Sequence, residues 1–132
     1  GCISATVAVN NLKPTECIVI DATHATDYPT SLIKTKGDIK INNGVAIGVG
    51  ADTSVYVSNK LIQLATEHSL DYQREPIPRN SYTEANVIQN SSIGIKTGIL
   101  SVPCRYMHSP HEICGIDDIT TTIRLLKLYC NH

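Results

Sequence analysis

The chain has no phenylalanine and no tryptophan among its 132 residues, so six tyrosines supply its only large aromatic rings. Large aromatic side chains usually contribute much of the buried area that stabilises a domain. The sequence also opens at Gly1, with neither an initiator methionine nor a polar tail. Both features predict that these residues are one part of a larger protein.

The chain also lacks a long apolar run and an excess of either charge. Its formal net charge is −1 and its basic residues are scattered, which is not the electrostatic footprint of a nucleic-acid-binding protein. No apolar stretch approaches the roughly 20 residues of a membrane-spanning helix, and the N-terminus does not resemble an export signal. We therefore expect a cytoplasmic protein with no nucleic-acid or membrane partner.

No Cys-x-x-Cys pair occurs, and the number of cysteines is odd. One cysteine lies inside a predicted core strand, where a thiol behaves as a small hydrophobic group. We expect reduced cytosolic thiols rather than a disulfide framework at Cys2, Cys17, Cys104, Cys114 and Cys130.

Apolar periodicity predicts alternating helices and strands. Helical spacing is found over residues 3–11, 53–68, 83–89 and 117–130. β-Branched or alternating residues predict strands over 17–21, 38–41, 70–77 and 97–102. The expected helix caps are Asp52 or Thr53 for the second helix and Asp117 or Asp118 for the last.

Glycine and proline refine this prediction. Pro76 and Pro78 place the third strand at a sheet edge. Gly44, Gly48 and Gly50 predict a loop around the apolar residues between them. The order of elements predicts an α/β fold, a three-layer αβα sandwich with a mostly parallel sheet, and residues 1–132 form one unit without a linker.

A carboxylate and an imidazole each follow a predicted strand. Asp21 ends the strand that begins at Cys17, and His108 lies just beyond the strand 97–102. Because ligands bind outside the carboxyl ends of strands in open α/β sheets, the two side chains are candidates for a shared metal site. The alternatives are that Asp21 caps its own loop and that His108 is an ordinary loop histidine. His111 is not a candidate, because Pro110 prevents the helical spacing of a His-Glu-x-x-His site.

Several segments, in the same order, resemble those of one known family. The segment from Asp21 reads Asp-Ala-Thr-His-Ala-Thr-Asp-Tyr-Pro, and the segment from Pro103 reads Pro-Cys-Arg-Tyr-Met-His-Ser-Pro-His-Glu. The others are Gly1-Cys2-Ile3-Ser4-Ala5, Pro14, Gly48-Val49-Gly50, Gln73 and Ser81-Tyr82-Thr83-Glu84-Ala85. Over essentially its whole length the chain thus resembles the dinuclear-metal aminopeptidases of the glutamyl-aminopeptidase and tetrahedral-aminopeptidase family, whose members are often labelled endoglucanases.

The resemblance implies a function for the parent protein and a partial site in this chain. It makes Asp21 a ligand of one metal ion and His108 a ligand of the other. The family's remaining ligands and its general base, a glutamate, would lie upstream of Gly1, so no catalytic residue lies within this chain. The chain would be the C-terminal portion of a catalytic domain that uses two divalent ions, zinc or cobalt, to hydrolyse peptides, and that belongs to a homo-oligomer.

Three residues are candidates for binding substrate. His24 is close enough to Asp21 in sequence to face the same site, although an exposed loop imidazole is an equal alternative. Thr83 lies in the turn that resembles the family's Gly-Gly-Thr-Asp-Ala, and it is also expected to cap a helix. Arg105 is suited to hold a carboxylate, and a neighbouring side chain is favoured over a substrate terminus.

The same turn departs from the family pattern. Glu84 replaces its aspartate, and Ser81-Tyr82 replace its two glycines. A longer carboxylate and a bulkier backbone are expected to reshape the loop beside the substrate pocket, which leaves the residue preference open.

Two rival functions remain at this stage. One is a non-catalytic α/β remnant that binds a partner or assembles into an oligomer. The other is an endoglucanase, but glycoside hydrolysis needs two carboxylates around a sugar cleft, and neither an acid pair nor an aromatic platform is evident.

Overall fold

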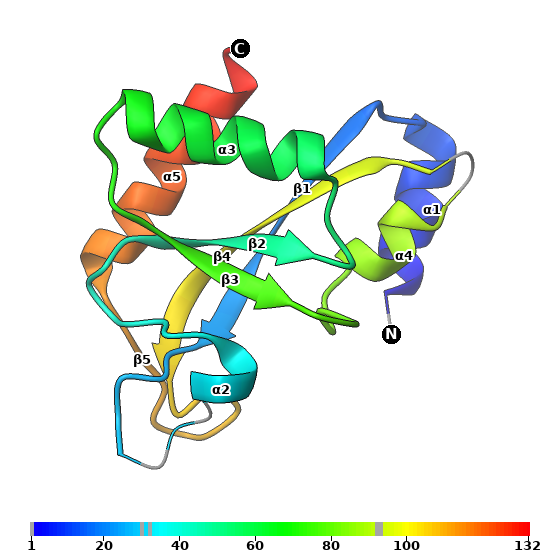
Figure 1. Ribbon diagram of the computed structural model, residues 1–132. Coiled ribbons are helices and arrows are strands. Elements are labelled where there is room, and N and C mark those ends of the chain that lie inside the picture. The colour runs from blue at the N-terminus through cyan, green and yellow to red at the C-terminus, as the bar shows by residue number, and fades with distance from the viewer. Residues whose placement is uncertain (1, 30, 32, 92–93) are drawn as a thin grey trace.

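The computed structural model describes residues 2–29, 31, 33–91 and 94–132, and Gly1 of the first family-like segment lies outside them. Figure 1 shows helices packed on both sides of a sheet. The elements are α1 (Ile3–Leu12), β1 (Glu16–His24), α2 (Ile33–Lys36), β2 (Val45–Gly50), α3 (Val55–Glu67), β3 (Tyr72–Ile77), α4 (Ala85–Gln89), β4 (Lys96–Arg105), β5 (Ile113–Cys114) and α5 (Ile116–Cys130).

The sheet consists of two parallel pairs that meet in the middle. Its order is β1-β4-β2-β3, with β5 pairing to β4. β1 runs parallel to β4 along its whole length, and β2 runs parallel to β3. Only two residue pairs join β2 to β4, and these are antiparallel. The two halves therefore cross at an angle (Figure 1), and the expectation of a mostly parallel sheet with β3 at an edge is confirmed.

Two apolar clusters separate the helices into layers. The cluster between the sheet and helices α3 and α5 includes Val45, Ile47, Leu61, Leu100 and Leu125. The cluster on the opposite face, beneath α1 and α4, includes Val9, Val19, Ile77, Ile88 and Ile99. Neighbouring residues of β4, Ile99 and Leu100, belong to different clusters because successive strand side chains point to opposite faces. The predicted three-layer α/β sandwich is confirmed.

The order of elements differs from the prediction in three places, since α2 and β5 were not expected and the second strand lies farther along the chain. The alternating residues from Asp38 do not form a strand; Ile39 is fully buried in a loop, where its backbone exchanges hydrogen bonds with Thr26. The predicted loop at 45–47 is instead strand β2. Its glycines permit close packing, since a Cβ on Gly48 would lie 2.8 Å from the Ile77 side chain.

The expected helix caps also differ. Ser54 occupies the N-cap of α3 without a side-chain cap, and Gly115 occupies that of α5. Asp52 and Asp118 instead use their carboxylates to bind other segments. Asp118 is fully buried and accepts hydrogen bonds from the backbone N–H groups of Asn42 and Gly44, both at 2.8 Å, which fixes the loop before β2.

Within the part of the chain that the structure describes, every helix is too short or too polar to traverse a lipid bilayer. All five cysteines are free thiols, as expected.

Candidate functional site

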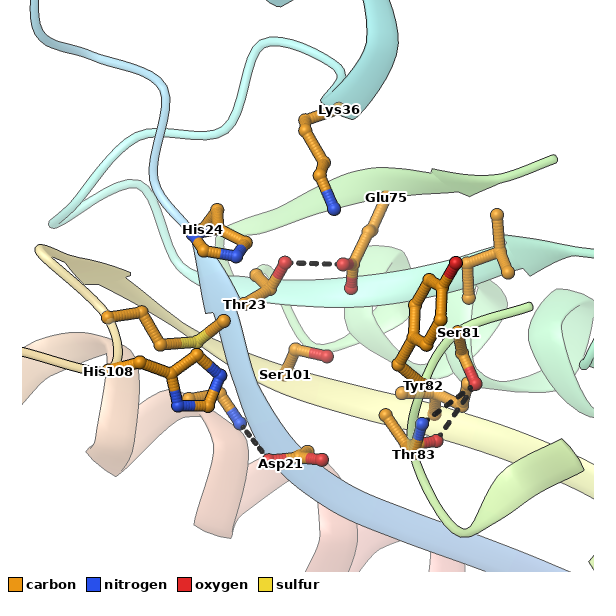
Figure 2. Close-up of a pocket in the computed structure, with 14 residues that line it drawn as sticks. Asp21, Thr23, His24, Lys36, Glu75, Ser81, Tyr82, Thr83, Ser101 and His108 are labelled. Carbon is orange, nitrogen blue, oxygen red and sulfur yellow. Dashed lines mark hydrogen bonds between the residues drawn. The ribbon is translucent and has the colours of Figure 1, made fainter. Parts of the chain in front are cut away.

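A cavity of about 280 Å³ opens where the two halves of the sheet cross. Figure 2 shows its side chains, which come from β1, α2, β3, β4 and the loops after β3 and β4. The polar residues that line it are Asp21, Thr23, His24, Lys36, Glu75, Ser81, Thr83, Ser101 and His108. Its apolar lining includes Ile77 and Ile99, so the cavity occupies the same sheet face as α1 and α4. Asp21 and His108, far apart in sequence, thus lie in one cavity.

Asp21 lies within β1 rather than at its end. The strand continues to His24, and Asp21 pairs with Ser101 in the parallel ladder to β4. Its side chain is exposed, and its Oδ1 accepts a hydrogen bond of 2.8 Å from the backbone N–H of Ala22. The cavity therefore lies over the sheet face as well as beside the loops that follow β3 and β4, whereas the sequence suggested only a site beyond the carboxyl ends of the strands.

His108 lies on the loop after β4, and two contacts fix that loop. Tyr106 and His108 have left-handed backbones, with φ of 57° and 66°. The His108 backbone N–H donates to the carboxylate of Glu112 at 2.5 Å. His111 is exposed and is not among the residues of the cavity, so the two imidazoles are placed differently.

Arg105 anchors the start of this loop instead of lining the cavity. Its guanidinium donates two hydrogen bonds to the carboxylate of Asp27, each 2.7 Å long. This bidentate contact, together with the N–H of Ile41, holds the pKa of Asp27 below its usual value despite partial burial. Arg105 therefore forms a structural pair with a neighbouring carboxylate, which was the favoured alternative.

His24 faces His108 across the cavity. The two ring centroids are 6.5 Å apart, with the rings at 68° to each other. Partial burial lowers the pKa of His24, and the positive charge of Lys36 and the neighbouring His108 lower it further. A neutral imidazole at this position is therefore favoured near pH 7, which is the form that accepts hydrogen bonds or coordinates metals.

Glu75 is the main residue of the cavity that sequence reasoning missed. Burial raises its pKa, and hydrogen bonds from Thr23 and Ser101 only partly oppose this effect. Its Oε2 is buried and has no hydrogen-bond partner among the described residues. Period-two alternation could have placed it, because Glu75 and the core residue Ile77 point to the same face of β3.

Thr83 lies on the loop between β3 and α4. Glu84 rather than Thr83 occupies the N-cap of α4, although the Thr83 Oγ1 accepts a hydrogen bond of 3.1 Å from the N–H of Ala85, the first residue of the helix. Asp52 holds both sides of Thr83, since its carboxylate accepts the backbone N–H of Ser81 and a side-chain N–H of Asn86. The loop is thus tied to the start of α3.

The residues of this cavity match a divalent metal ion in chemical type. A carboxylate and imidazoles are the ligands that zinc and cobalt bind in proteins. No group of three or more possible ligands is arranged to hold a metal within residues 2–29, 31, 33–91 and 94–132. The described residues therefore supply at most part of a coordination shell, with Asp21 and His108 as its candidates.

Known proteins resemble this chain in sequence and in fold. SgcX of Escherichia coli strain K12 is 37% identical over an alignment of 128 positions that covers 89% of this chain and 34% of that protein. An aminopeptidase structure from the archaeon Desulfurococcus kamchatkensis is 26% identical, with a TM-score of 0.88 over 98% of this chain and 37% of that one.

The TET1 peptidase of Pyrococcus horikoshii shares the fold, with 21% identity and a TM-score of 0.75 over 98% of this chain and 37% of its own; it assembles into a tetrahedron or an octahedral shell. This chain thus spans about a third of the length of the proteins it matches. The model of the M42 glutamyl aminopeptidase family matches residues 1–125, and the chain belongs to that family.

Proposed function

We propose that this chain is the C-terminal portion of the catalytic domain of a metal-dependent aminopeptidase, which removes residues from the N-termini of peptides. The observation that carries the proposal is that Asp21 and His108 line one cavity although they lie on β1 and on the loop after β4. Membership of the M42 family supports peptide hydrolysis as the chemistry of the intact protein.

Asp21 and His108 would each hold one of two divalent ions, zinc or cobalt. Bound ions of this kind supply Lewis acidity toward a peptide carbonyl and the attacking water. The ladder between β1 and β4 positions the Asp21 carboxylate. Arg105 and Glu112 hold the loop so that the His108 ring stays beside the cavity.

The other polar residues would bind the peptide. Neutral His24 is suited to accept a hydrogen bond from substrate, and Thr83 presents a hydroxyl on the opposite wall (Figure 2). Arg105 reaches substrate only if its pair with Asp27 opens, so its role is to position the His108 loop. General-base catalysis is assigned to a residue outside these 132, as the family resemblance implies.

The intact protein is proposed to act in the cytoplasm as a homo-oligomer. Its partners are then peptides, further copies of itself and the upstream part of the same domain, without nucleic acid or membrane. Exposed apolar side chains on α1, among them Ile3 and Leu12, are suited to contact that upstream part. The rival function is a non-catalytic module that binds a partner or assembles without chemistry.

Hydrolysis of aminoacyl-p-nitroanilides by the full-length protein tests the proposal. We expect activity that a chelator abolishes and that zinc or cobalt restores, and no activity from the 132-residue chain alone. Activity that resists chelation would contradict the role of metal. A full-length protein that binds no metal and hydrolyses none of the substrates would support the non-catalytic rival instead.

A further inference from the structure

Tyr82 has an unusual backbone and an unusual environment. Its φ is 60°, in the left-handed region that a tyrosine rarely adopts because Cβ crowds the neighbouring carbonyl. The residue is 88% exposed, the largest exposed fraction among the large hydrophobic residues that the structure describes. Such strain persists only where surrounding contacts impose it, and it is concentrated at functional sites.

The contacts that impose this conformation are specific. The Tyr82 backbone N–H donates to the side chain of Asn80 at 2.7 Å. The preceding N–H, of Ser81, donates to the carboxylate of Asp52, which is only 5% exposed. The Ser81 and Thr83 hydroxyls lie 3.0 Å apart on either side of Tyr82. Hydrogen bonds therefore fix the loop to Asp52, which lies just before α3, and also join its own side chains just before α4. The fixed backbone sets the direction of the Tyr82 ring.

The ring lies between two cavities. The first contains Asp21 and His108, and Figure 2 shows Tyr82 on the side away from His108. The second, of about 210 Å³, also has Tyr82 in its lining, together with Pro76, Ile77 and Pro78 among other residues. The residues that line both cavities are Lys36, Glu75, Ile77, Ser81 and Tyr82. A molecule held beside Asp21 and His108 can therefore extend past this ring into the second cavity.

We propose that Tyr82 determines specificity by forming the apolar surface on which a large apolar side chain of the substrate's first residue rests as it enters the second cavity. The inference rests on the proposed aminopeptidase function. An exposed tyrosine ring presents a large apolar face and loses little conformational freedom when it is covered, because it has only two side-chain torsions. Pro76, Ile77 and Pro78 form the apolar part of the lining of the second cavity, which also includes polar and charged residues. Leucine or phenylalanine at the first position should therefore be preferred over alanine.

The backbone strain makes an unusually clean test possible. Glycine adopts a φ of 60° without a steric penalty, so Tyr82→Gly removes the ring without disturbing the loop. We expect its thermal midpoint to be no lower than that of the wild type. Tyr82→Phe keeps the ring and removes only the hydroxyl. Tyr56→Ala is the matched control, since Tyr56 is 53% exposed on α3 and lines neither cavity.

The experiment measures kcat/KM of the full-length protein for leucine-, phenylalanine-, glutamate- and alanine-p-nitroanilide. We expect Tyr82→Gly to lower the leucine-to-alanine and phenylalanine-to-alanine ratios about tenfold, a loss of about 1.4 kcal/mol. Tyr82→Phe and Tyr56→Ala should keep the wild-type ratios.

Three results would overturn the inference. Equal kcat/KM ratios in wild type and Tyr82→Gly would show that the ring does not recognise the side chain of the substrate's first residue. The proposed function would still stand. A wild-type preference for glutamate would show that Lys36 and Arg79, which also line the second cavity, select an acidic side chain instead. Absence of hydrolysis of all four substrates by the wild type would overturn the proposed function, and this inference with it.

Discussion

The two faces of the sheet differ in how completely their buried polar side chains are hydrogen-bonded. Beneath α3 and α5, buried polar side chains have partners: Ser58 donates to the carbonyl of Gly48 at 2.8 Å, and Thr122 donates to that of Asp118 at 2.7 Å. The buried side-chain atoms without a partner among the described residues, Glu75 Oε2 and Gln89 Oε1, belong to the opposite face with α4 and the cavity. Tyr82 and His108, with their left-handed backbones, also border that cavity.

This difference separates stability from function within one small sheet. A buried acceptor without a donor costs free energy, and so does a left-handed tyrosine, so neither contributes to folding. The α3 and α5 face carries a continuous apolar core that offsets such costs. Substitutions beneath α3 and α5 should therefore affect stability more than activity, and substitutions at the cavity should affect activity more than stability.

The largest effect on stability is expected at Leu61. Its side chain is fully buried in the cluster beneath α3 and α5. Leu61→Ala removes buried apolar area and leaves a cavity, which should lower the free energy of unfolding by about 2–5 kcal/mol. Val55→Ala on the same helix is the control, because Val55 is 75% exposed. Urea unfolding measures both, and equal losses would mean that this face is not the stabilising one.

His108 should show the reverse profile. His108→Ala in the full-length protein is expected to lose one metal ion per subunit and more than about 100-fold in turnover, because His108 is the proposed ligand of that ion. The thermal midpoint should change little, since the His108 side chain is exposed. His111→Ala should alter neither metal content nor rate. Elemental analysis and rate measurements separate the two variants. A larger loss of metal and rate in His111→Ala would mean that His111, and not His108, binds the metal.

The sequence predicted the layers better than the cavity. β1 and β4 were predictable from their β-branched runs, although β1 is only partly buried and its Ile20 is 52% exposed. Strand position and resemblance predicted that Asp21 and His108 lie together, and both line the cavity. The residues from Val45 to Gly50 were misread as a loop, because glycine there serves close packing rather than a turn. Alternation with Ile77 could have placed Glu75 on the core face of β3. No local pattern shows that β2 and β3 run antiparallel to β4 and cross it, which is what brings Glu75 to Thr23.

A smaller effect is expected at the contact that fixes the His108 loop. Asp27→Asn removes the charge that accepts two hydrogen bonds from Arg105, and it should cost about 1–2 kcal/mol at pH 7 because the Arg105 side chain is 35% exposed. The lowered pKa of Asp27 means that its contribution is present above the usual value of 3.8 and is lost as the pH falls through the folded-state value.

The difference in unfolding free energy between wild type and Asp27→Asn should therefore shrink below about pH 3.8. Urea unfolding between pH 7 and pH 3 measures it. A difference that stays constant over this range would mean that the ion pair does not stabilise the fold.

The smallest effect, and the one of opposite sign, is expected at Glu75. Since burial raises its pKa above the usual 4.5, the folded chain holds this proton more tightly than the unfolded chain does. Stability from this group is thus greatest at low pH and decreases as the pH rises through the folded-state value. Glu75→Gln removes the ionised form, so it should raise the thermal midpoint by about 1–3 °C at pH 8 and leave it nearly unchanged at pH 4. Glu67→Gln, an exposed position at the end of α3, is the control. A lower midpoint for Glu75→Gln at pH 8 would mean that the Glu75 carboxylate stabilises the cavity face, and that the two faces of the sheet are more alike than their hydrogen bonding indicates.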